Sequence, residues 1–203
     1  MSHQVTLSGQ FVDLRPLRLE DAELTFEWRR AARARLLNQG AQSVEAQAAW
    51  IRSRPAGEYN FVIALKDGEP VGMLSLVAVD HVHRRAEPGR FLIGNEAAVR
   101  GVPAAVEAMK LLYDFAFGTL GLIRVYGTVA DDNRRMVKWQ KYLGMREEGR
   151  LRRHYFIDNR FQDALIFALL EEEYRQETLP RMEALIALGD PRPGPDQVRR
   201  KQK

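Results

Sequence analysis

The chain has 203 residues, of which 45% are hydrophobic and 29% are charged, and its formal net charge is +4. This composition is typical of a soluble globular protein with one domain. The chain has no cysteine, which excludes a disulfide framework, a thiol nucleophile and a thiolate metal site. It has neither an apolar run of the roughly 20 residues that a membrane helix needs nor a signal-peptide pattern, so we expect a cytoplasmic protein. The modest positive charge favours anionic small molecules and gives no argument for nucleic acid.

The first part of the chain predicts one strand followed by two helices. Residues 11–17 read as the strand, and residues 20–37 as a helix whose acidic first turn and basic later turns suit the helix dipole. Ser43 is a suitable N-cap for a further helix that contains Trp50. Trp28 and Trp50 are either core anchors or walls of a substrate pocket, because buried aromatic residues dominate cores as well as binding sites.

The next part predicts a hairpin. Residues 59–65 and 70–80 read as strands, and the Asp-Gly pair between them is a hairpin signal. If the second strand continues, His81 and His83 share one face of it. Because no third ligand lies at a convincing spacing, we expect no metal site and place both histidines either in solvent or at the rim of a pocket.

Residues 93–145 organise the rest of the chain. A strand over 87–94, in which Pro88 predicts a bulge or a sheet edge, leads into a loop with Arg100 and Gly101. A helix then begins near Pro103, where a missing N–H costs little. A strand end followed by a glycine loop and a helix N-terminus presents backbone N–H groups and a positive dipole. This arrangement suits a phosphate or pyrophosphate.

The C-terminal half predicts further strands and helices. A strand over 123–129 and a polar loop precede a helix over 134–143. Residues 146–170 read as a hairpin, and residues 171–188 as a charged helix that packs on the core or on a partner subunit.

Three separated segments carry a family resemblance. The loop reads Arg100-Gly101-Val102-Pro103-Ala104-Ala105. The strand before it contains Ala86-Glu87 and Gly89, and the later segment contains Asp132-Asn133, Lys138 and Leu143-Gly144-Met145. In this order the segments resemble the GNAT acetyltransferase superfamily over residues 12–174, with the loop in the place of its Arg/Gln-x-x-Gly-x-Gly/Ala pattern.

The resemblance implies a fold and a coenzyme. The fold would be α/β (α+β), with a central mixed, splayed β-sheet of about seven strands flanked by helices. We expect a single acyl-CoA N-acyltransferase domain over residues 1–175, a C-terminal helix over 176–188 and a disordered tail over 189–203. Acetyl-CoA would be the co-substrate, and the resemblance places it against Leu92, Ile93, Arg100, Gly101, Val102, Pro103, Ala104, Ala105, Asn133 and Lys138.

Two positions depart from the family pattern. Pro103 stands where the family usually has glycine, which removes one backbone donor, and Gln140 stands where the family often has a general-acid tyrosine. A thiol titrates near 8.5, so the leaving thiolate needs little help, and we assign Gln140 to a hydrogen bond with the sulfur or the substrate. An amine must lose a proton before it attacks, and Glu87 is the favoured general base. The alternative for Glu87 is a structural carboxylate, and His81 and His83 are the second choices for the base.

The acceptor is a primary amine, and its identity stays open. The text around Trp28-Arg29 and Trp50 resembles a subgroup that acts on nucleotide-linked amino sugars, and the predicted substrate pocket consists of Trp28, Arg29, Trp50, His81 and His83. The opening at residues 14–23 resembles enzymes that acetylate N-termini of ribosomal proteins. A polyamine, an antibiotic and a non-catalytic acyl-CoA-binding role are further alternatives. The resemblance also allows a homodimer, and we expect no nucleic-acid or membrane partner.

Overall fold

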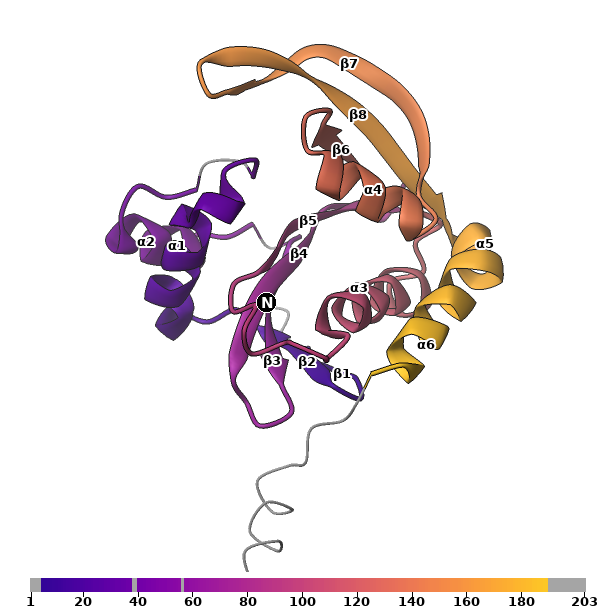
Figure 1. The fold of residues 1–203 in the computed structure, drawn as a ribbon, viewed down its shortest axis with the longest axis horizontal. Helices are drawn as coiled ribbons and strands as arrows, with labels where there is room; N and C mark the ends of the chain where they lie inside the picture. The colour runs from indigo at the N-terminus through magenta and orange to yellow at the C-terminus, as the bar shows by residue number, and fades with distance from the viewer. Residues whose placement is uncertain (1–4, 38–39, 56, 190–203) are drawn as a thin grey trace, which may run out of the picture.

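An eight-stranded sheet forms the centre of the fold, and helices flank it on both sides (Figure 1). The computed structural model describes residues 5–37, 40–55 and 57–189. The strands lie in the order β1-β2-β3-β4-β5-β6-β8-β7, and neighbours are antiparallel except for β5 and β6, which are parallel. Their bounds are β1 Leu7–Ser8, β2 Val12–Pro16, β3 Tyr59–Leu65, β4 Pro70–Asp80, β5 Arg85–Ile93, β6 Arg124–Ala130, β7 Arg146–Ile157 and β8 Arg160–Leu170.

The mixed sheet confirms the predicted fold class, with one strand more than expected. The additional strand is β1, which has two residues and pairs with β2. A strand pattern needs about four alternating residues to be recognised. The sequence therefore carries no signal for β1.

β5 and β6 separate soon after they meet. Within the part of the chain that the structure describes, they pair only over residues 85–86 and 124–125. From Glu87 to Ile93, β5 follows its own course and leaves its backbone on that side without a ladder to β6. The expected splay is therefore confirmed.

A bulge interrupts β5 within the splayed part. The register of β5 against β4 shifts between Gly89 and Leu92. Arg90 lies at this shift and has a left-handed backbone with φ of 54°. A bulge re-aims the side chains around it. Pro88 predicted a bulge or an edge, and the bulge lies just C-terminal to it.

The helices occupy both sides of the sheet. In Figure 1, α1 and α2 lie together on one side, and α3 and α6 lie on the other. In the described residues no helix is long and apolar enough to cross a membrane. The bounds are α1 Ala22–Arg30, α2 Val44–Arg52, α3 Ala104–Asp114, α4 Arg134–Tyr142, α5 Glu171–Glu173 and α6 Leu179–Ala187, with short 3-10 or π segments at Leu19–Asp21, Ala32–Ala34, Phe115–Thr119 and Tyr174–Thr178.

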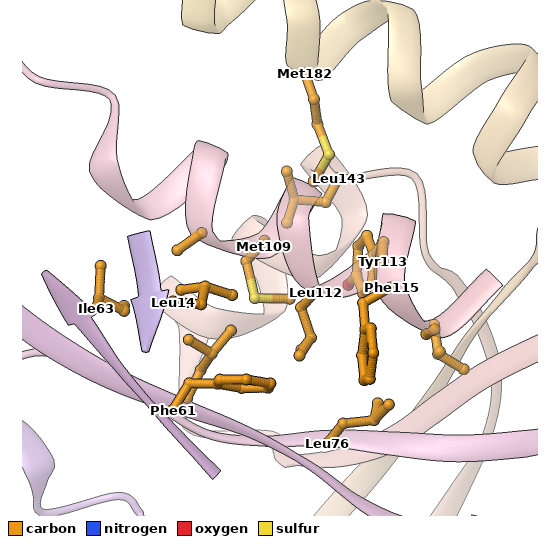
Figure 2. Packing of buried hydrophobic residues seen from close by; sticks show 14 of the residues in the cluster. Leu14, Phe61, Ile63, Leu76, Met109, Leu112, Tyr113, Phe115, Leu143 and Met182 are labelled. Atoms are coloured by element: carbon orange, nitrogen blue, oxygen red, sulfur yellow. The ribbon is translucent and has the colours of Figure 1, made fainter. Parts of the chain in front are cut away.

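The main hydrophobic core lies between the sheet and α3. Met109 and Leu112 of α3 point toward Phe61 and other strand residues (Figure 2), and these side chains are buried. Met182 of α6 is fully buried in the same core. The C-terminal helical segment therefore packs on the core of its own chain, which was one of the two predicted positions. The tail predicted to be disordered lies outside the described residues from residue 190 onward.

The helix predicted over residues 20–37 is wrong in its second half. α1 ends at Arg30, because Ala31 adopts an extended backbone with ψ of 147°. The chain then makes a short 3-10 turn, and Ala34 is buried with Trp28 and the sheet. The residues in this segment favour a helix on their own. Packing against the sheet overrides that preference and directs the following chain over a cavity.

Candidate active site

Two cavities open beside the splay between β5 and β6. The first has a volume of about 620 Å³ and lies between the sheet and the α1 and α2 region. The second has a volume of about 550 Å³ and lies between β5 and α4. Both are lined by Leu36, Leu37, Phe91, Asn133 and Met136. The two cavities therefore adjoin, and molecules bound in them would meet at the splay.

The first cavity collects polar and aromatic side chains from many elements. α1 and α2 supply three of them, β5 and β6 supply three, and α4 with its N-cap residue and β7 supply the rest. They are Arg29, Gln47, Trp50, Glu87, Arg90, Thr128, Asn133, Gln140 and Tyr155. Arg29 and Trp50 belong to the predicted substrate pocket, and Glu87 and Gln140 are the predicted catalytic residues.

Glu87 lies at the mouth of the splay. Its Cγ is 3.5 Å from the position that a Cβ on Gly127 of β6 would occupy, so the side chain covers the backbone of β6 there. Burial raises the pKa of Glu87 above its ordinary value, and the positive charge of Arg90 opposes this rise. A carboxylate whose pKa is raised toward neutrality is a better proton acceptor for an amine. The position and the direction of the shift fit the predicted general base.

Arg90 is a cavity residue that sequence reasoning missed. Its Nη1 donates to Glu58 Oε2 at 2.8 Å and to Asn60 Oδ1 at 2.9 Å. Its guanidinium lies over the ring of Trp50, 5.0 Å from the ring centre. An arginine on a strand has no distinguishing sequence pattern. Only the predicted bulge near Pro88 pointed to an unusual residue at this place.

A second missed pair consists of Thr128 and Tyr155. The two hydroxyl oxygens are 2.6 Å apart in a hydrogen bond. Thr128 is on β6, and Tyr155 reaches the cavity from β7, whose register against β8 shifts between Leu151 and Tyr155. The contact joins two strands that are not neighbours in the sheet, so the sequence holds no signal for it.

The second cavity contains part of the predicted coenzyme set. Leu92 and Ile93 of β5, Ala105 of α3, and Asn133 and Lys138 line it. The other predicted residues precede or begin α3 and are not among the described lining residues. These are Arg100, Gly101, Val102, Pro103 and Ala104.

The start of α3 tests the effect of Pro103. Pro103 is the N-cap residue, and the first N–H that pairs within the helix is that of Glu107, which donates to the Pro103 carbonyl at 3.0 Å. The first N–H groups of a helix have no partner inside it. The donors of residues 104–106 are therefore not used by the helix, and Pro103 removes only the donor before them. Gly101 has φ of 76°, which favours glycine.

α4 presents two unpartnered polar atoms. Gln140 Oε1 and Trp139 Nε1 are buried and have no hydrogen-bond partner among the described residues. Gln140 lines the first cavity and Trp139 lines the second. Asn133 is fixed at the N-terminus of the same helix, where its Oδ1 accepts from the N–H of Met136 at 3.2 Å. A buried polar group without a partner is costly. Consecutive residues of a helix point about 100° apart, so each atom can serve only a ligand in the cavity on its own side of α4.

Three predicted pocket residues do not line either cavity. Trp28 is buried with 8% exposure and packs flat on the end of β5, since a Cβ at Gly94 would lie 2.2 Å from its ring. It is a core anchor, which was the alternative prediction. β4 ends at Asp80, so His81 and His83 do not share a strand face and instead lie exposed in the turn before β5.

Comparison with known proteins finds acetyltransferases at the levels of family, sequence and structure. A family model described as "Acetyltransferase (GNAT) domain" matches residues 12–146. The spermidine N(1)-acetyltransferase of Escherichia coli (strain K12) is 33% identical over 120 residues, which cover 59% of this chain and 62% of that protein. The Bacillus subtilis (strain 168) protein YdaF, proposed to be a ribosomal N-acetyltransferase, is 33% identical over 113 residues, covering 56% of this chain and 60% of that protein. The chain therefore matches less than two thirds of the length of these relatives.

A solved structure extends the match over most of the chain. The structure of Mycobacterium smegmatis RimJ in complex with CoA-disulfide is 27% identical and has a TM-score of 0.75. The match covers 91% of this chain and 97% of the Mycobacterium smegmatis chain.

Proposed function

This chain belongs to the GNAT acetyltransferase family, and we propose that it transfers an acetyl group from acetyl-CoA to a primary amine. The pair of adjoining cavities at the splay carries this proposal. The second cavity would hold the coenzyme, and the first would hold the acceptor. Their shared lining would bring the two reactants together, which is where a transferase gains most from positioning.

The residues of the second cavity fit acetyl-CoA. Ala105 lies in the first turn of α3, whose N–H groups and positive dipole suit the pyrophosphate. Leu92 and Ile93 lie on the part of β5 that has no ladder to β6, so their backbone can pair with the pantetheine arm. Trp139 lines this cavity, and its Nε1 is a buried donor without a hydrogen-bond partner among the described residues. When bound, the coenzyme supplies an acetyl group activated as a thioester.

The side chains around the splay supply the remaining chemistry. Glu87 would accept the proton that the amine loses before attack. The N–H of Leu92 or Ile93 would donate to the thioester oxygen as negative charge grows on it. Gln140 would hydrogen-bond the sulfur or the acceptor in place of a tyrosine. No strong general acid is required, because a thiolate is a good leaving group near neutral pH.

For the acceptor, we keep a nucleotide-linked amino sugar as the first candidate. Arg29 and Trp50, which belong to the segments that resemble the amino-sugar subgroup, line the first cavity. The N-terminal amine of a ribosomal protein is the second candidate, and the name of the Bacillus subtilis relative supports it. The name of the Escherichia coli relative supports a polyamine. A homodimer and a cytoplasmic location stay predictions.

Coenzyme binding tests the assignment of the second cavity. We expect Ala105→Glu to weaken acetyl-CoA binding by about tenfold or more, because a carboxylate in the first turn of α3 would repel the pyrophosphate. Isothermal titration with acetyl-CoA measures this change, and Ala105→Ser is the control that keeps a small neutral side chain. Equal binding by wild type and Ala105→Glu would overturn the placement of the coenzyme. A wild-type protein that does not bind acetyl-CoA would overturn the proposed function itself.

A further inference from the structure

We propose that the acceptor amine carries an acidic group, a carboxylate or a phosphate, which Arg29 and Arg90 bind at the α1 and α2 end of the first cavity. This inference rests on the proposed function, since it names the chemical class of that enzyme's acceptor. The inference goes beyond the proposed function because it assigns an anion subsite to two named side chains.

Two guanidinium groups and one carboxylate are the charged side chains among the described residues that line the first cavity. The guanidinium groups belong to Arg29 and Arg90, and the carboxylate belongs to Glu87. The pKa of Arg29 is lowered, first by burial and then by the positive charge of Arg90. Both guanidinium groups line this one cavity. Two like charges that line one partly buried cavity favour an anion bound there.

Arg90 is held in place before any ligand binds. Its side chain is 27% exposed, whereas the side chain of its partner Glu58 is only 15% exposed and does not line the cavity. Glu58 therefore lies behind Arg90 as seen from the cavity. Asn60 Oδ1 also accepts from Arg90, and the hydroxyl of Ser75 donates to the same oxygen at 2.7 Å. This network fixes the guanidinium, so ligand binding would cost little side-chain entropy at Arg90.

The order of residues along β5 gives the acceptor a direction. Glu87 lies at the mouth of the splay, and Arg90 follows at the bulge, where it contacts Trp50 of α2. An amine beside Glu87 would therefore have its acidic group toward α2. Trp50, whose ring lies under the Arg90 guanidinium, also lines the cavity and adds apolar surface next to the anion subsite. A polyamine would instead bring further positive charge against Arg29 and Arg90.

Matched amines test this inference. The phosphate arm compares an amino-sugar phosphate and a nucleotide-linked amino sugar with the free amino sugar, and the carboxylate arm compares γ-aminobutyrate with butylamine. Spermidine serves as the polycationic probe. Thiol release from acetyl-CoA gives kcat/KM for each amine. We expect kcat/KM for an amine with an acidic group to exceed kcat/KM for the matched amine without one by about tenfold or more. The arm that shows this difference identifies the acidic group.

Arg29→Gln should reduce the ratio of kcat/KM between the amine with the acidic group and its matched amine toward one. Arg30→Gln is the matched control, because Arg30 is the next residue of α1, is exposed and does not line the cavity. It should leave the ratio as in wild type. The inference is overturned if amines without an acidic group, or spermidine, are acetylated as fast as the acidic amines. That result would leave the proposed function standing.

A binding measurement decides the inference if no amine is acetylated, an outcome that would count against the proposed function. The amino-sugar phosphate, the nucleotide-linked amino sugar and γ-aminobutyrate are titrated separately into the protein saturated with CoA. Binding of one of them that weakens about tenfold in Arg29→Gln supports the anion subsite without any turnover. Absence of binding by all three, or equal binding by wild type and Arg29→Gln, overturns it.

Discussion

Replacing Glu87 by glutamine is expected to lower kcat/KM for acetyl transfer by about 100-fold or more. Glutamine keeps the size of the side chain and its contact with the backbone of β6 at Gly127. It cannot accept a proton at the pH of the assay, so the amine would have to lose its proton to water. Thiol release at several amine concentrations measures the change, and titration with acetyl-CoA should show that the coenzyme still binds.

The pH dependence separates a base from a structural carboxylate. Burial raises the pKa of Glu87, and only its deprotonated form accepts a proton. The kcat/KM of wild type should therefore rise as pH rises through that pKa, at a higher pH than an exposed glutamate would give. This rise of kcat/KM with pH should be absent in Glu87→Gln. Glu45→Gln, an exposed change on α2, should keep it. A wild-type rate and profile in Glu87→Gln would contradict the assignment.

Glu107→Ala is expected to lower the free energy of unfolding by about 3 kcal/mol. Glu107 is 4% exposed in α3, and its carboxylate accepts from the backbone N–H groups of Gln10, Phe11 and Val12 at 2.6, 2.7 and 2.8 Å. Alanine would leave these three donors without their acceptor at the point where the N-terminal strands meet α3. The melting temperature should fall by roughly 6–12 °C for a chain of this size. Chemical denaturation gives the same comparison as a free energy.

Two further variants show whether the carboxylate is responsible. Glu107→Gln keeps the volume and one acceptor oxygen but turns an amide N–H toward the backbone donors, so we expect a smaller loss than with alanine. Glu172→Ala changes an exposed glutamate of α5 and should alter stability by about 0.5 kcal/mol or less. Unfolding of Glu107→Ala at the wild-type midpoint would show that water replaces the carboxylate without cost.

Local sequence signals predicted much of the sheet. The strands over 59–65 and 70–80 occur as predicted, because their β-branched and apolar residues and the Asp-Gly turn agree with the final fold. Gly144 ends α4 with φ of 88°, as expected of glycine after a helix. The helix over 20–37 failed for the opposite reason, since its local preference disagrees with the packing of Ala34.

The site was predictable where motifs lie along the chain and not where distant segments meet. Glu87, Gln140 and Asn133 were predicted from a family resemblance, and all three line a cavity. Arg90 depends on a bulge, and Tyr155 depends on the register of β7, so neither was predictable from nearby residues.

Other residues show the same limit. The contact of Glu107 with residues 10–12 joins positions 95 to 97 residues apart in the sequence and had no local signal. His81 and His83 failed because the strand that would have aligned them ends at Asp80.

Product analysis tests the central claim most directly. Wild-type protein is incubated with acetyl-CoA and the amine panel, and mass spectrometry of the amines is compared with the amount of free CoA thiol. If the two cavities hold coenzyme and acceptor side by side, an N-acetylated amine and free CoA will appear in equal amounts. If acetyl-CoA binds but no amine of any class becomes acetylated, the chain is a coenzyme-binding protein, and the account of its site as a transferase centre is wrong.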